Sequence, residues 1–419
     1  MHDPYEAFRY LAFRLYAASY VLAVVGSQVL SSTVQWDIYQ QTKDPFAIGL
    51  VGLINAIPVI LLALPAGHVA DRFSRKRVLI ITQVPLTVAP ALLAVSHIVY
   101  PQHVSLTLTF TLLGANAVAL TFGRPARASI LPNLVPRSVY PNAFAWMSSM
   151  FETAAWVGPA ISGVLIAFSV AWSYLISALC LLVCLTITFF LPRDVPSEPT
   201  THEPDSRALS AGLRFVFDSP LLLAAMTLDL LAVLLGGATF LMPIFAEQLG
   251  IGSIGYGWMR AAPALGAFAM AVAQAHRSPF KHAGRTLLWS VATFGAATIV
   301  FGLSQNFWLS LTMLVLIGAS DNISVVIRQT LVQSLTPDSM RGRVSAVNQV
   351  FIGASNELGG LESGVTAKLF GPVASVVGGG FGTLLVVLSI AAKWPQLRRL
   401  GSLRDLQTPN QTPSKQDSE

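Results

Sequence analysis

The residues of this chain that could carry chemistry are carboxylates placed inside long apolar runs. Asp37, Glu152, Asp229 and Asp321 each lie in such a run. An isolated charge surrounded by hydrocarbon is costly, so acids of this kind are paired with a cation or hold a proton. Each of the four is therefore a candidate proton carrier. An ion pair or a helix-end charge with no transfer role is the alternative for each of them.

Spacing suggests structural partners for two of the acids in these runs. Arg328 follows Asp321 by seven residues, which is close to two helical turns, so both side chains could share one helix face and pair. Glu357 could likewise pair with a cation or cap a helix at one membrane surface. These assignments compete with proton transfer, and the sequence leaves both open.

No enzyme motif accompanies the acids. A Gly-x-x-x-x-Gly-Lys-Ser/Thr loop is absent, and the Gly378–Gly380 run lies in an apolar segment without a following lysine. Cys180 and Cys184 are four residues apart in one apolar run, where packing explains them without a disulfide. The histidines form no cluster with these cysteines. We therefore predict no catalytic residues, no cofactor and no metal.

Composition identifies a membrane protein. The 419 residues are 53% hydrophobic and only 11% charged, and the mean hydropathy is +0.62. Soluble domains carry about 25% charged residues. The isoelectric point of about 9.5 does not indicate nucleic-acid binding, because the basic residues form several short groups instead of one patch. The lipid bilayer is the partner that this composition predicts.

Twelve apolar runs divide the chain into segments of membrane-spanning length. A helix needs about 20 residues to cross a hydrocarbon core about 30 Å thick, and most runs approach or exceed this length. The first run is too long for the hydrophobic part of a cleaved signal peptide, so we expect it to remain as a helix. We predict an all-α polytopic membrane protein with spans near 12–38, 46–67, 78–99, 103–124, 141–168, 170–191, 219–248, 254–275, 286–304, 307–330, 344–368 and 371–393.

The distribution of basic residues predicts the orientation of these spans. If both termini are cytoplasmic, Lys and Arg should concentrate in the termini and in every second loop. All of the 26 Lys and Arg residues except Lys43, Arg260 and Lys368 fall on that side. A wrong number of spans would disturb this alternation, so the pattern supports twelve spans and cytoplasmic termini.

The predicted spans form two halves. Residues 1–191 contain six runs, residues 192–218 are a polar linker rich in Pro, Ser and Thr, and residues 219–393 contain the other six. Residues 394–419 are polar and are predicted to be a disordered cytoplasmic tail. The sequence thus predicts an N-terminal six-helix bundle and a C-terminal six-helix bundle.

A basic loop between the second and third runs carries a family signature. Residues 67–77 read Gly-His-Val-Ala-Asp-Arg-Phe-Ser-Arg-Lys-Arg, and the spacing Gly-x-x-x-Asp-Arg-x-x-Arg-Lys resembles the signature of the major facilitator superfamily. The resemblance implies two pseudo-symmetric six-helix bundles and a conformational latch that stabilises the outward-facing state. The alternative is that these cations only fix the topology. The latch residues would be Gly67, Asp71, Arg72, Arg75 and Lys76, with Arg75 as the partner of Asp71.

The two halves share a weak repeat on the predicted cytoplasmic side. Residues 127–136 and 328–337 each begin with Arg and end with Pro, at equivalent places after the fourth and tenth runs. These segments, with Thr336–Asn348, resemble the branch of the superfamily that contains the bacterial enterobactin exporter. That resemblance implies a location in the bacterial cytoplasmic membrane. The repeat residues are Arg127, Pro136, Arg328, Pro337, Arg341 and Arg343.

A glycine-proline segment in the fifth run favours export. Gly158, Pro159 and Gly163 stand in Trp-Val-Gly-Pro-Ala-Ile-Ser-Gly, which partly resembles a motif of proton-coupled exporters. Small residues permit close helix approach, and proline permits a bend. Ordinary helix packing would use the same residues.

Polar and aromatic residues in the spans suggest a central cavity for an amphipathic molecule. Such a surface would combine amide groups with aromatic rings. Some of these aromatic residues could instead belong to the membrane interface. The candidates are Gln35, Trp36, Asn55, Asn116, Trp146, Met242 and Phe245.

Together, the residues and the resemblance imply a secondary transporter that acts as a monomer. It would export a small drug-like or siderophore-like substrate by alternating access, in exchange for protons. Proton-coupled import of a nutrient and a non-transporting membrane scaffold or sensor are the alternatives. Proton-dependent accumulation of a nutrient would indicate the importer, and absence of flux in liposomes would indicate the scaffold.

Overall fold

The structure is a computed structural model that describes residues 3–100, 104–131, 134–192, 206–276, 280–402 of the 419-residue chain. These residues are almost entirely helical, as the apolar runs predict. Residues 193–205 of the predicted linker and residues 403–419 of the predicted tail lie outside the described residues.

Six long helices form the N-terminal bundle. Short polar residues begin several of them: the side chains of Asp44, Ser74, Ser105 and Ser169 each accept a hydrogen bond from a backbone N–H of the following first turn. A short 3-10 helix, η1 (Glu6–Arg9), precedes the bundle, and η3 (Arg137–Val139) leads into its fifth helix. The helices are α1 (Leu11–Thr42), α2 (Pro45–Arg72), α3 (Arg75–Val99), α4 (Leu106–Ile130), α5 (Tyr140–Phe168) and α6 (Val170–Phe190).

The C-terminal bundle follows a short helix, α7 (Ser206–Asp218), which packs against α13. At the far end of the bundle lies α15 (Pro395–Arg399). Sequence analysis assigned 395–399 to a disordered tail, and that prediction is wrong for these residues. Buried Leu397 explains the difference, because its backbone packs against Gly284. The bundle contains α8 (Pro220–Leu235), η4 (Ala238–Leu241), α9 (Met242–Gln248), α10 (Gly252–Ala275), α11 (Ala283–Leu303), α12 (Phe307–Leu335), α13 (Asp338–Phe370) and α14 (Pro372–Lys393).

The membrane-spanning segments agree with the twelve predicted runs. Ten segments of the described chain are long and apolar enough to cross a membrane, and one of these joins α8 to α9. The remaining two long helices, α10 and α13, lie between such spans and have 24 and 33 residues. The charges of α13 explain its lower hydropathy. The fold is an all-α polytopic membrane fold.

The predicted run 219–248 is not one continuous helix. The helix breaks at Gly236 and Gly237 and continues through η4 into α9. A Cβ atom on Gly237 would lie 2.5 Å from the Gly359 carbonyl oxygen and 2.5 Å from Ser363 Oγ, so only glycine permits this close approach to α13. Non-helical backbone at membrane depth is tolerated where protein covers it, as here.

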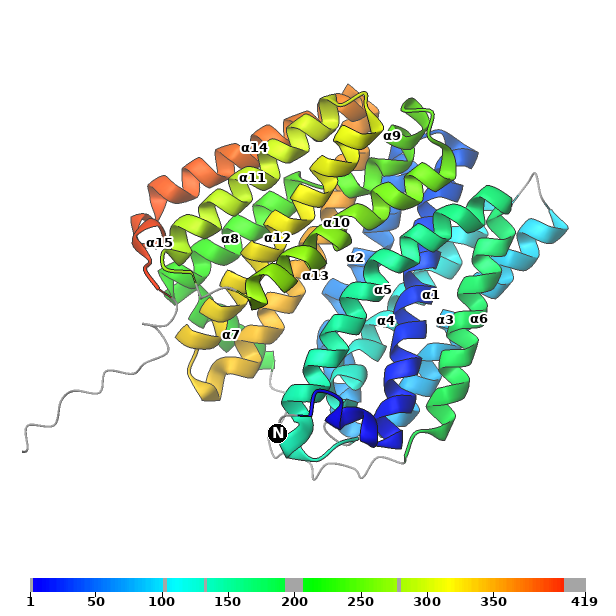
Figure 1. Ribbon diagram of the computed structural model, residues 1–419, viewed down its shortest axis with the longest axis horizontal. Helices are drawn as coiled ribbons and strands as arrows, with labels where there is room; N and C mark the ends of the chain where they lie inside the picture. The colour runs from blue at the N-terminus through cyan, green and yellow to red at the C-terminus, as the bar shows by residue number, and fades with distance from the viewer. Residues whose placement is uncertain (1–2, 101–103, 132–133, 193–205, 277–279, 403–419) are drawn as a thin grey trace, which may run out of the picture.

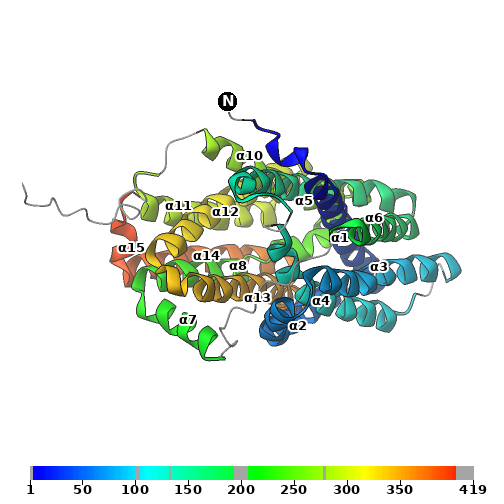
Figure 2. The same cartoon turned by 90° about the horizontal axis from the view of Figure 1, so that it is seen from below.

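The two bundles contact each other through two pairs of helices. α2 lies along α13, and α5 lies along α10 (Figures 1 and 2). The helices α3 and α6 pack together at the outside of the N-terminal bundle, and α11 and α14 pack together in the C-terminal bundle. α1 packs between α5 and α6, so it can transmit movement between the outside of its bundle and the interface.

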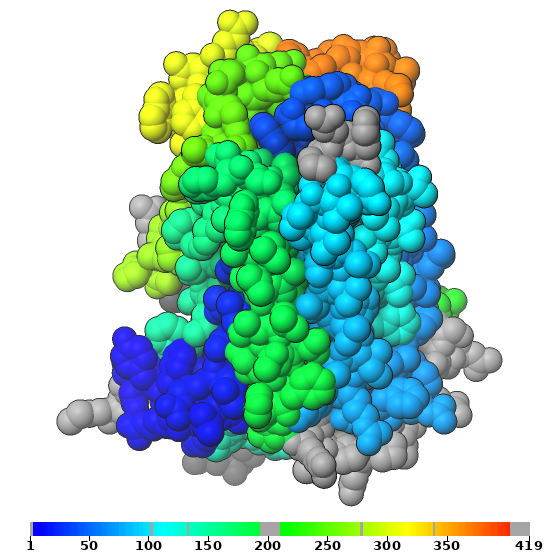
Figure 3. Space-filling view, turned by 90° about the vertical axis from the view of Figure 1, so that its right-hand side faces the viewer, coloured from blue at the N-terminus to red at the C-terminus, as the bar shows by residue number. Residues whose placement is uncertain are grey.

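The outer face of the N-terminal bundle is apolar. Figure 3 shows α6 in green beside α3 in light blue, and both helices expose large hydrophobic side chains. A water-soluble protein rarely exposes so large an apolar face, whereas lipid tails cover it at no cost. The exposed side chains include Ile81, Val84, Val88, Leu92, Val95, Leu179, Leu182 and Val183.

Candidate functional site

Two glycine crossings hold the bundles together at one end of the molecule. At the first crossing, a Cβ atom on Gly163 of α5 would lie 2.7 Å from Gly257 Cα of α10. At the second, a Cβ atom on Gly364 of α13 would lie 2.7 Å from Gly49 Cα of α2. Any side chain at these positions would separate the backbones. We call this the closed end, and the end that carries residues 67–77 the opposite end.

Two ion pairs also join the bundles at the closed end. Lys43 Nζ, after the last turn of α1, lies 2.8 Å from Glu247 Oε2 of α9. Lys368 Nζ of α13 lies 2.8 Å from Asp44 Oδ2, which precedes α2. Lys43 and Lys368 are two of the three basic residues that departed from the predicted charge pattern. Both therefore connect the halves across the closed end.

The Lys368 ion pair should make closure weakly dependent on pH. Partial burial would raise the pKa of Asp44, but hydrogen bonds from Lys368 Nζ and from the Phe46 backbone N–H outweigh it and hold this pKa below its usual value. The pair therefore favours closure above the usual carboxyl pKa, and this contribution is lost as the pH falls through the lowered pKa.

We expect Lys368→Gln to open the closed end by a small factor. Half-exposed ion pairs contribute less than about 1 kcal/mol, which is about a fivefold change in a population ratio. Spin labels on the exposed Trp172 and Trp308 positions of the two bundles, in a variant with both cysteines replaced, would measure that ratio. A change in the population ratio well above tenfold would contradict this account. An effect of Lys368→Gln that persists at high salt would also contradict it, because salt screens an exposed ion pair.

A cavity of about 480 Å³ lies inside the N-terminal bundle and reaches the C-terminal bundle. Its apolar wall comes from α1, α2, α3, α4 and α5, and includes Val24, Leu113 and Phe151. Its size is typical of small-molecule sites. The polar groups on its wall are Tyr20, Ser27, Gln28, Ser31, Asn55, Thr82, Asn116, Thr121, Arg124, Arg127 and Glu357.

Glu357 is the charged group through which the C-terminal bundle enters this cavity. Asn55 Nδ2 of α2 donates a hydrogen bond of 3.2 Å to Glu357 Oε2 of α13. The guanidinium groups of Arg124 on α4 and Arg260 on α10 also act on the Glu357 carboxylate electrostatically. Cations from both bundles therefore surround one acid. The sequence presents Glu357 as a charged residue within a span and favours a capping or pairing role for it, but does not predict its place in the cavity.

The predicted cavity residues are divided between the cavity wall and the protein core. Asn55 and Asn116 line the cavity, and Asn116 Nδ2 is buried without a hydrogen-bond partner in the described chain. Trp146 does not line it, because its Nε1–H donates to the Pro4 carbonyl at the opposite end. Trp36 does not line the cavity either, and its ring contacts the ring of Tyr256 instead.

Three of the predicted cavity residues are core residues instead. Met242 and Phe245 of α9 are fully or almost fully buried in one apolar cluster with Tyr256 and Phe301. Gln35 of α1 is buried and does not belong to the cavity wall. The prediction for these three residues is therefore wrong. An amide, a thioether and an aromatic ring each suit an amphipathic cavity, but the helix faces that carry these three residues turn into the packed interior.

Asp229 and Arg328 form a buried ion pair inside the C-terminal bundle. Arg328 of α12 is 2% exposed and pairs with the Asp229 carboxylate of α8. The predicted pairing of Arg328 with Asp321 is therefore wrong. Arg328 is also buried within α12, whereas the sequence repeat placed it after the helix. Asp229 reaches Arg328 from α8, which packs against α12.

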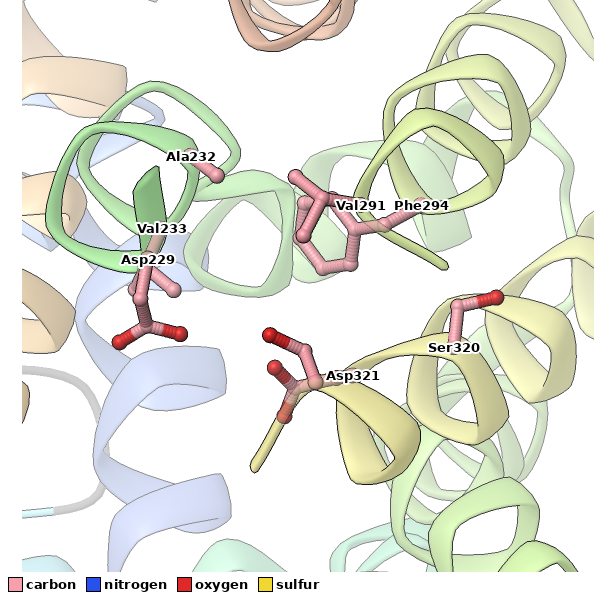
Figure 4. A pocket seen from close by; sticks show the side chains of 8 residues that line it. Asp229, Ala232, Val233, Val291, Phe294, Ser320 and Asp321 are labelled. Carbon is pink, nitrogen blue, oxygen red and sulfur yellow. The ribbon is translucent and has the colours of Figure 1, made fainter. Parts of the chain in front are cut away.

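Asp321 faces the same space as Asp229. Both carboxylates point into a small gap between α8 and α12, beside Ser320 and Phe294 (Figure 4). Glu152 of α5 acts electrostatically on Asp321 of the other bundle and on Tyr20 of its own bundle. The structure thus brings two of the four predicted carriers, Asp229 and Asp321, to one gap within the C-terminal bundle.

Asp37 lies apart from the other three acids, near the closed end. Its carboxylate is 4% exposed and accepts a 2.9 Å hydrogen bond from Tyr174 Oη of α6. His97 Nε2 of α3 lies 3.1 Å from the same carboxylate. Sequence analysis named neither His97 nor Tyr174. A histidine near the end of an apolar run gives no signal for an acid 60 residues away.

Two cations of the predicted latch loop hold backbone carbonyls of their own bundle. Arg75 Nη1 donates to the Ser129 carbonyl of α4 at 2.9 Å, and Lys76 Nζ donates to the Phe189 carbonyl of α6 at 2.8 Å. The predicted ion pair between Asp71 and Arg75 is absent from the described residues. Asp71 and Arg72 are exposed, and a Cβ atom on Gly67 would meet open space.

The other predicted motif residues lie at helix junctions and crossings. Gly158 packs against Gln28 of α1, where an added Cβ would lie 2.6 Å from the Gln28 Cβ, and Pro159 lies within α5 one turn before Gly163. Within the repeat, Arg127 lines the cavity with its guanidinium 5.8 Å from the Tyr20 ring. Pro136 precedes η3, Pro337 precedes α13, and Arg341 and Arg343 are exposed on α13.

Clusters of three or more His, Cys, Asp or Glu residues suited to a metal ion are absent from the part of the chain that the structure describes. The recognisable features are thus a cavity, buried acids and contacts that join two bundles at one end.

Comparison with known proteins agrees with these features. Residues 2–416 match the family described as Transmembrane secretion effector. The chain is 26% identical to the enterobactin exporter EntS of Escherichia coli O1:K1 / APEC over 393 residues, with 93% of each chain covered. The same values hold for the enterobactin exporter EntS of Shigella boydii serotype 18 (strain CDC 3083-94 / BS512).

Solved transporter structures share the fold at low sequence identity. A bacterial homolog of the human lysosomal transporter Spinster, in an inward-facing and occupied conformation, gives a TM-score of 0.73 at 13% identity and covers 98% of this chain and 100% of that chain. The nucleoside transporter NupG gives 0.69 at 15% identity, covering 92% and 99%. The family match confirms a transporter and not an enzyme. The chain therefore belongs to the Transmembrane secretion effector family, in the branch of the major facilitator superfamily that resembles EntS.

Proposed function

We propose that this transporter exports a small amphipathic molecule, siderophore-like or drug-like, in exchange for protons. The observation that carries the proposal is the cavity of about 480 Å³, which one bundle encloses and Glu357 of the other bundle enters. A ligand in this cavity would contact both halves. Its binding could therefore be coupled to their relative movement, as alternating access requires.

The cavity wall favours an amphipathic substrate with acceptor oxygens. Apolar side chains such as Val24, Leu113 and Phe151 offer surface for rings or short chains. Asn116 Nδ2 is a buried donor without a partner in the described chain, and a substrate oxygen would satisfy it. Arg124 and Arg127 add cationic donors. The similarity to enterobactin exporters supports a siderophore-like cargo and outward transport.

We further infer that both termini face the cytoplasm of a bacterium and that residues 1–191 and 219–393 move as two units within one chain. The closed end would then face outward, and the cavity would load from the cytoplasm. In this orientation Lys43 and Lys368 lie on the outward side, where basic residues are otherwise rare. Their ion pairs across the closed end give each of them a specific role there. The latch loop would join the halves only in the opposite state.

Proton coupling rests on the buried acids. Glu152 and Asp321 belong to different bundles and act on each other electrostatically, and Asp229 already has a cation. An acid that changes its neighbours as the bundles move would bind a proton from one side and release it to the other. The likeness to solved transporter structures shows only the fold, so proton coupling has to be measured on this protein.

A variant that fills the cavity tests the export proposal. We expect Asn116→Trp to reduce export at least fivefold, because the indole would occupy the space where the substrate binds. The measurement is retention of a catecholate siderophore and of fluorescent amphipathic dyes in bacteria that lack their own exporters. Trp146→Phe is the matched control, since Trp146 lies outside the cavity. Equal export by Asn116→Trp and the parent would contradict the cavity assignment, and higher retention than in empty cells would indicate import.

A further inference from the structure

His97, Asp37 and Tyr174 form a polar cluster that the export mechanism above does not use. The three side chains come from α3, α1 and α6, and they meet inside the N-terminal bundle near the closed end. Side-chain exposure is only 9% for His97 and 5% for Asp37, and Tyr174 is fully buried. The rings of His97 and Tyr174 lie 5.1 Å apart, which fixes the imidazole against its neighbour.

Both ring nitrogens of His97 face hydrogen-bond acceptors. Nδ1 lies 2.9 Å from the Leu93 carbonyl oxygen, one turn earlier in α3. Nε2 lies 3.1 Å from the Asp37 carboxylate. A carbonyl oxygen can only accept, so Nδ1 must carry a hydrogen for that bond to exist. A neutral imidazole then has a bare lone pair on Nε2, directed at a carboxylate.

The geometry therefore requires one additional proton. If His97 holds it, an imidazolium donates from both nitrogens. If Asp37 holds it, the carboxylic acid donates to Nε2. Without the proton, each neutral tautomer of His97 loses one of its two hydrogen bonds and places a lone pair against an oxygen, which is costly where water is excluded.

Asp37 accepts two other hydrogen bonds, and neither of them supplies a proton for its contact with His97. Tyr174 Oη donates to Oδ2 at 2.9 Å and Gln41 Nε2 donates to Oδ1 at 2.9 Å. Titratable neighbours on adjoining elements are Tyr39 and Lys43 on α1, and Tyr256 on α10 beyond Tyr174. Within the described chain, no hydrogen bond or ion pair joins His97 or Asp37 to a charged residue of α2, α4 or α5. This arrangement can thus hold one proton between His97 and Asp37.

The cluster also lies on the part of α1 that closes the molecule. Trp36, next to Asp37, contacts the ring of Tyr256 on α10 at 5.1 Å. Tyr256 Oη donates to the Ser32 carbonyl of α1 at 2.8 Å, and Lys43 at the end of α1 pairs with Glu247. A change at Asp37 would therefore act on the same helix segment that contacts the other bundle.

From this geometry we propose that His97 and Asp37 together form a proton-binding site that is occupied while the closed end is shut. This inference deepens the proposed proton coupling and names a site for it. Proton binding favours whichever state holds the proton more tightly, so occupancy would favour closure. Loss of the proton would release this bias and permit opening.

The proton can be observed without any transport assay. Histidine labelled with ¹⁵N and ¹³C in the purified full-length protein reports the charge and tautomer of His97, and His97→Gln assigns its signal. Near neutral pH we expect either an imidazolium signal that disappears in Asp37→Asn, or a neutral ring with hydrogen on Nδ1 and a carboxylic-acid infrared band that disappears in Asp37→Asn. A neutral ring with hydrogen on Nε2, together with no such band, would overturn the proposal.

A second measurement separates this site from export itself. His97→Gln keeps a hydrogen-bonding side chain but cannot take up the proton. We expect it to lose at least tenfold in gradient-driven accumulation while retaining substrate exchange at equal pH. His276→Gln is the matched control, since His276 Nδ1 also lies 2.9 Å from a carbonyl oxygen one turn earlier but its side chain is exposed and does not contact Asp37, and this variant should retain gradient-driven accumulation. Full gradient-driven accumulation by His97→Gln would overturn the site even if the export proposal holds. If the parent shows no proton-driven transport, the labelled-histidine result still decides whether the proton is present.

Discussion

Replacing Gly163 with valine is expected to reduce transport by at least tenfold. A Cβ atom at this position would lie 2.6 Å from the Ser253 carbonyl oxygen and 2.7 Å from Gly257 Cα, so α5 and α10 would have to separate. Overpacking of this kind costs about 1–3 kcal/mol, and each 1.4 kcal/mol changes a population ratio about tenfold. The larger valine side chain adds to this cost. A protein that cannot shut the closed end cannot complete a cycle of alternating access.

The second crossing and a distant glycine provide the comparison. Gly364→Val should have a similar effect, because its added Cβ would lie 2.7 Å from Gly49 Cα. Gly378→Val is the matched control, since an added Cβ at Gly378 of α14 meets no atom within 4 Å. Transport and the distance between spin labels at the closed end should be measured together. Normal transport by Gly163→Val, or equal losses in Gly378→Val, would contradict the role assigned to the crossings.

Replacing Arg328 with methionine is expected to destabilise the C-terminal bundle strongly. The guanidinium is 2% exposed and pairs with Asp229, and its removal leaves a buried carboxylate without a cation. Breaking one side of a buried ion pair typically costs about 3–5 kcal/mol. The loss should appear as a lower melting temperature of the purified protein in detergent, with tryptophan fluorescence as the signal of unfolding.

A double variant distinguishes a lost pair from a lost contact. Because Asp229→Leu removes the orphaned charge, the double variant Asp229→Leu with Arg328→Met should recover most of the stability that Arg328→Met loses. Asp321→Asn in the Arg328→Met background should recover little, since Arg328 pairs with Asp229. Recovery by Asp321→Asn instead would show that Asp321 is the main partner of Arg328.

The order and number of spans could be predicted from sequence because hydrophobic length is a one-dimensional property. Apolar runs and the alternation of basic residues required no knowledge of packing. The break at Gly236 and Gly237 could not be predicted in this way. Two glycines in an apolar run are equally compatible with tight packing of a continuous helix, and only the approach of Gly359 and Ser363 requires the break.

The site was predicted only in part, for a related physical reason. Residue type indicates that Asn116 and Met242 could line a cavity, but helix rotation decides which one does, and only Asn116 does so. Partners distant in sequence were also beyond prediction. Arg328 was assigned to Asp321 on its own helix, whereas α8 places Asp229 beside it. The pairing of His97 with Asp37 depends in the same way on the packing of α3 against the bundle.

The measurement that tests the central claim most directly is substrate uptake by inside-out membrane vesicles under an imposed proton gradient. The vesicles should contain the full-length protein, with an acidic interior and a labelled catecholate siderophore or amphipathic dye outside. The account predicts accumulation that requires the gradient, collapses when a protonophore is added, and falls in Asn116→Trp. Accumulation that is the same with and without the gradient would contradict proton-coupled export by this transporter.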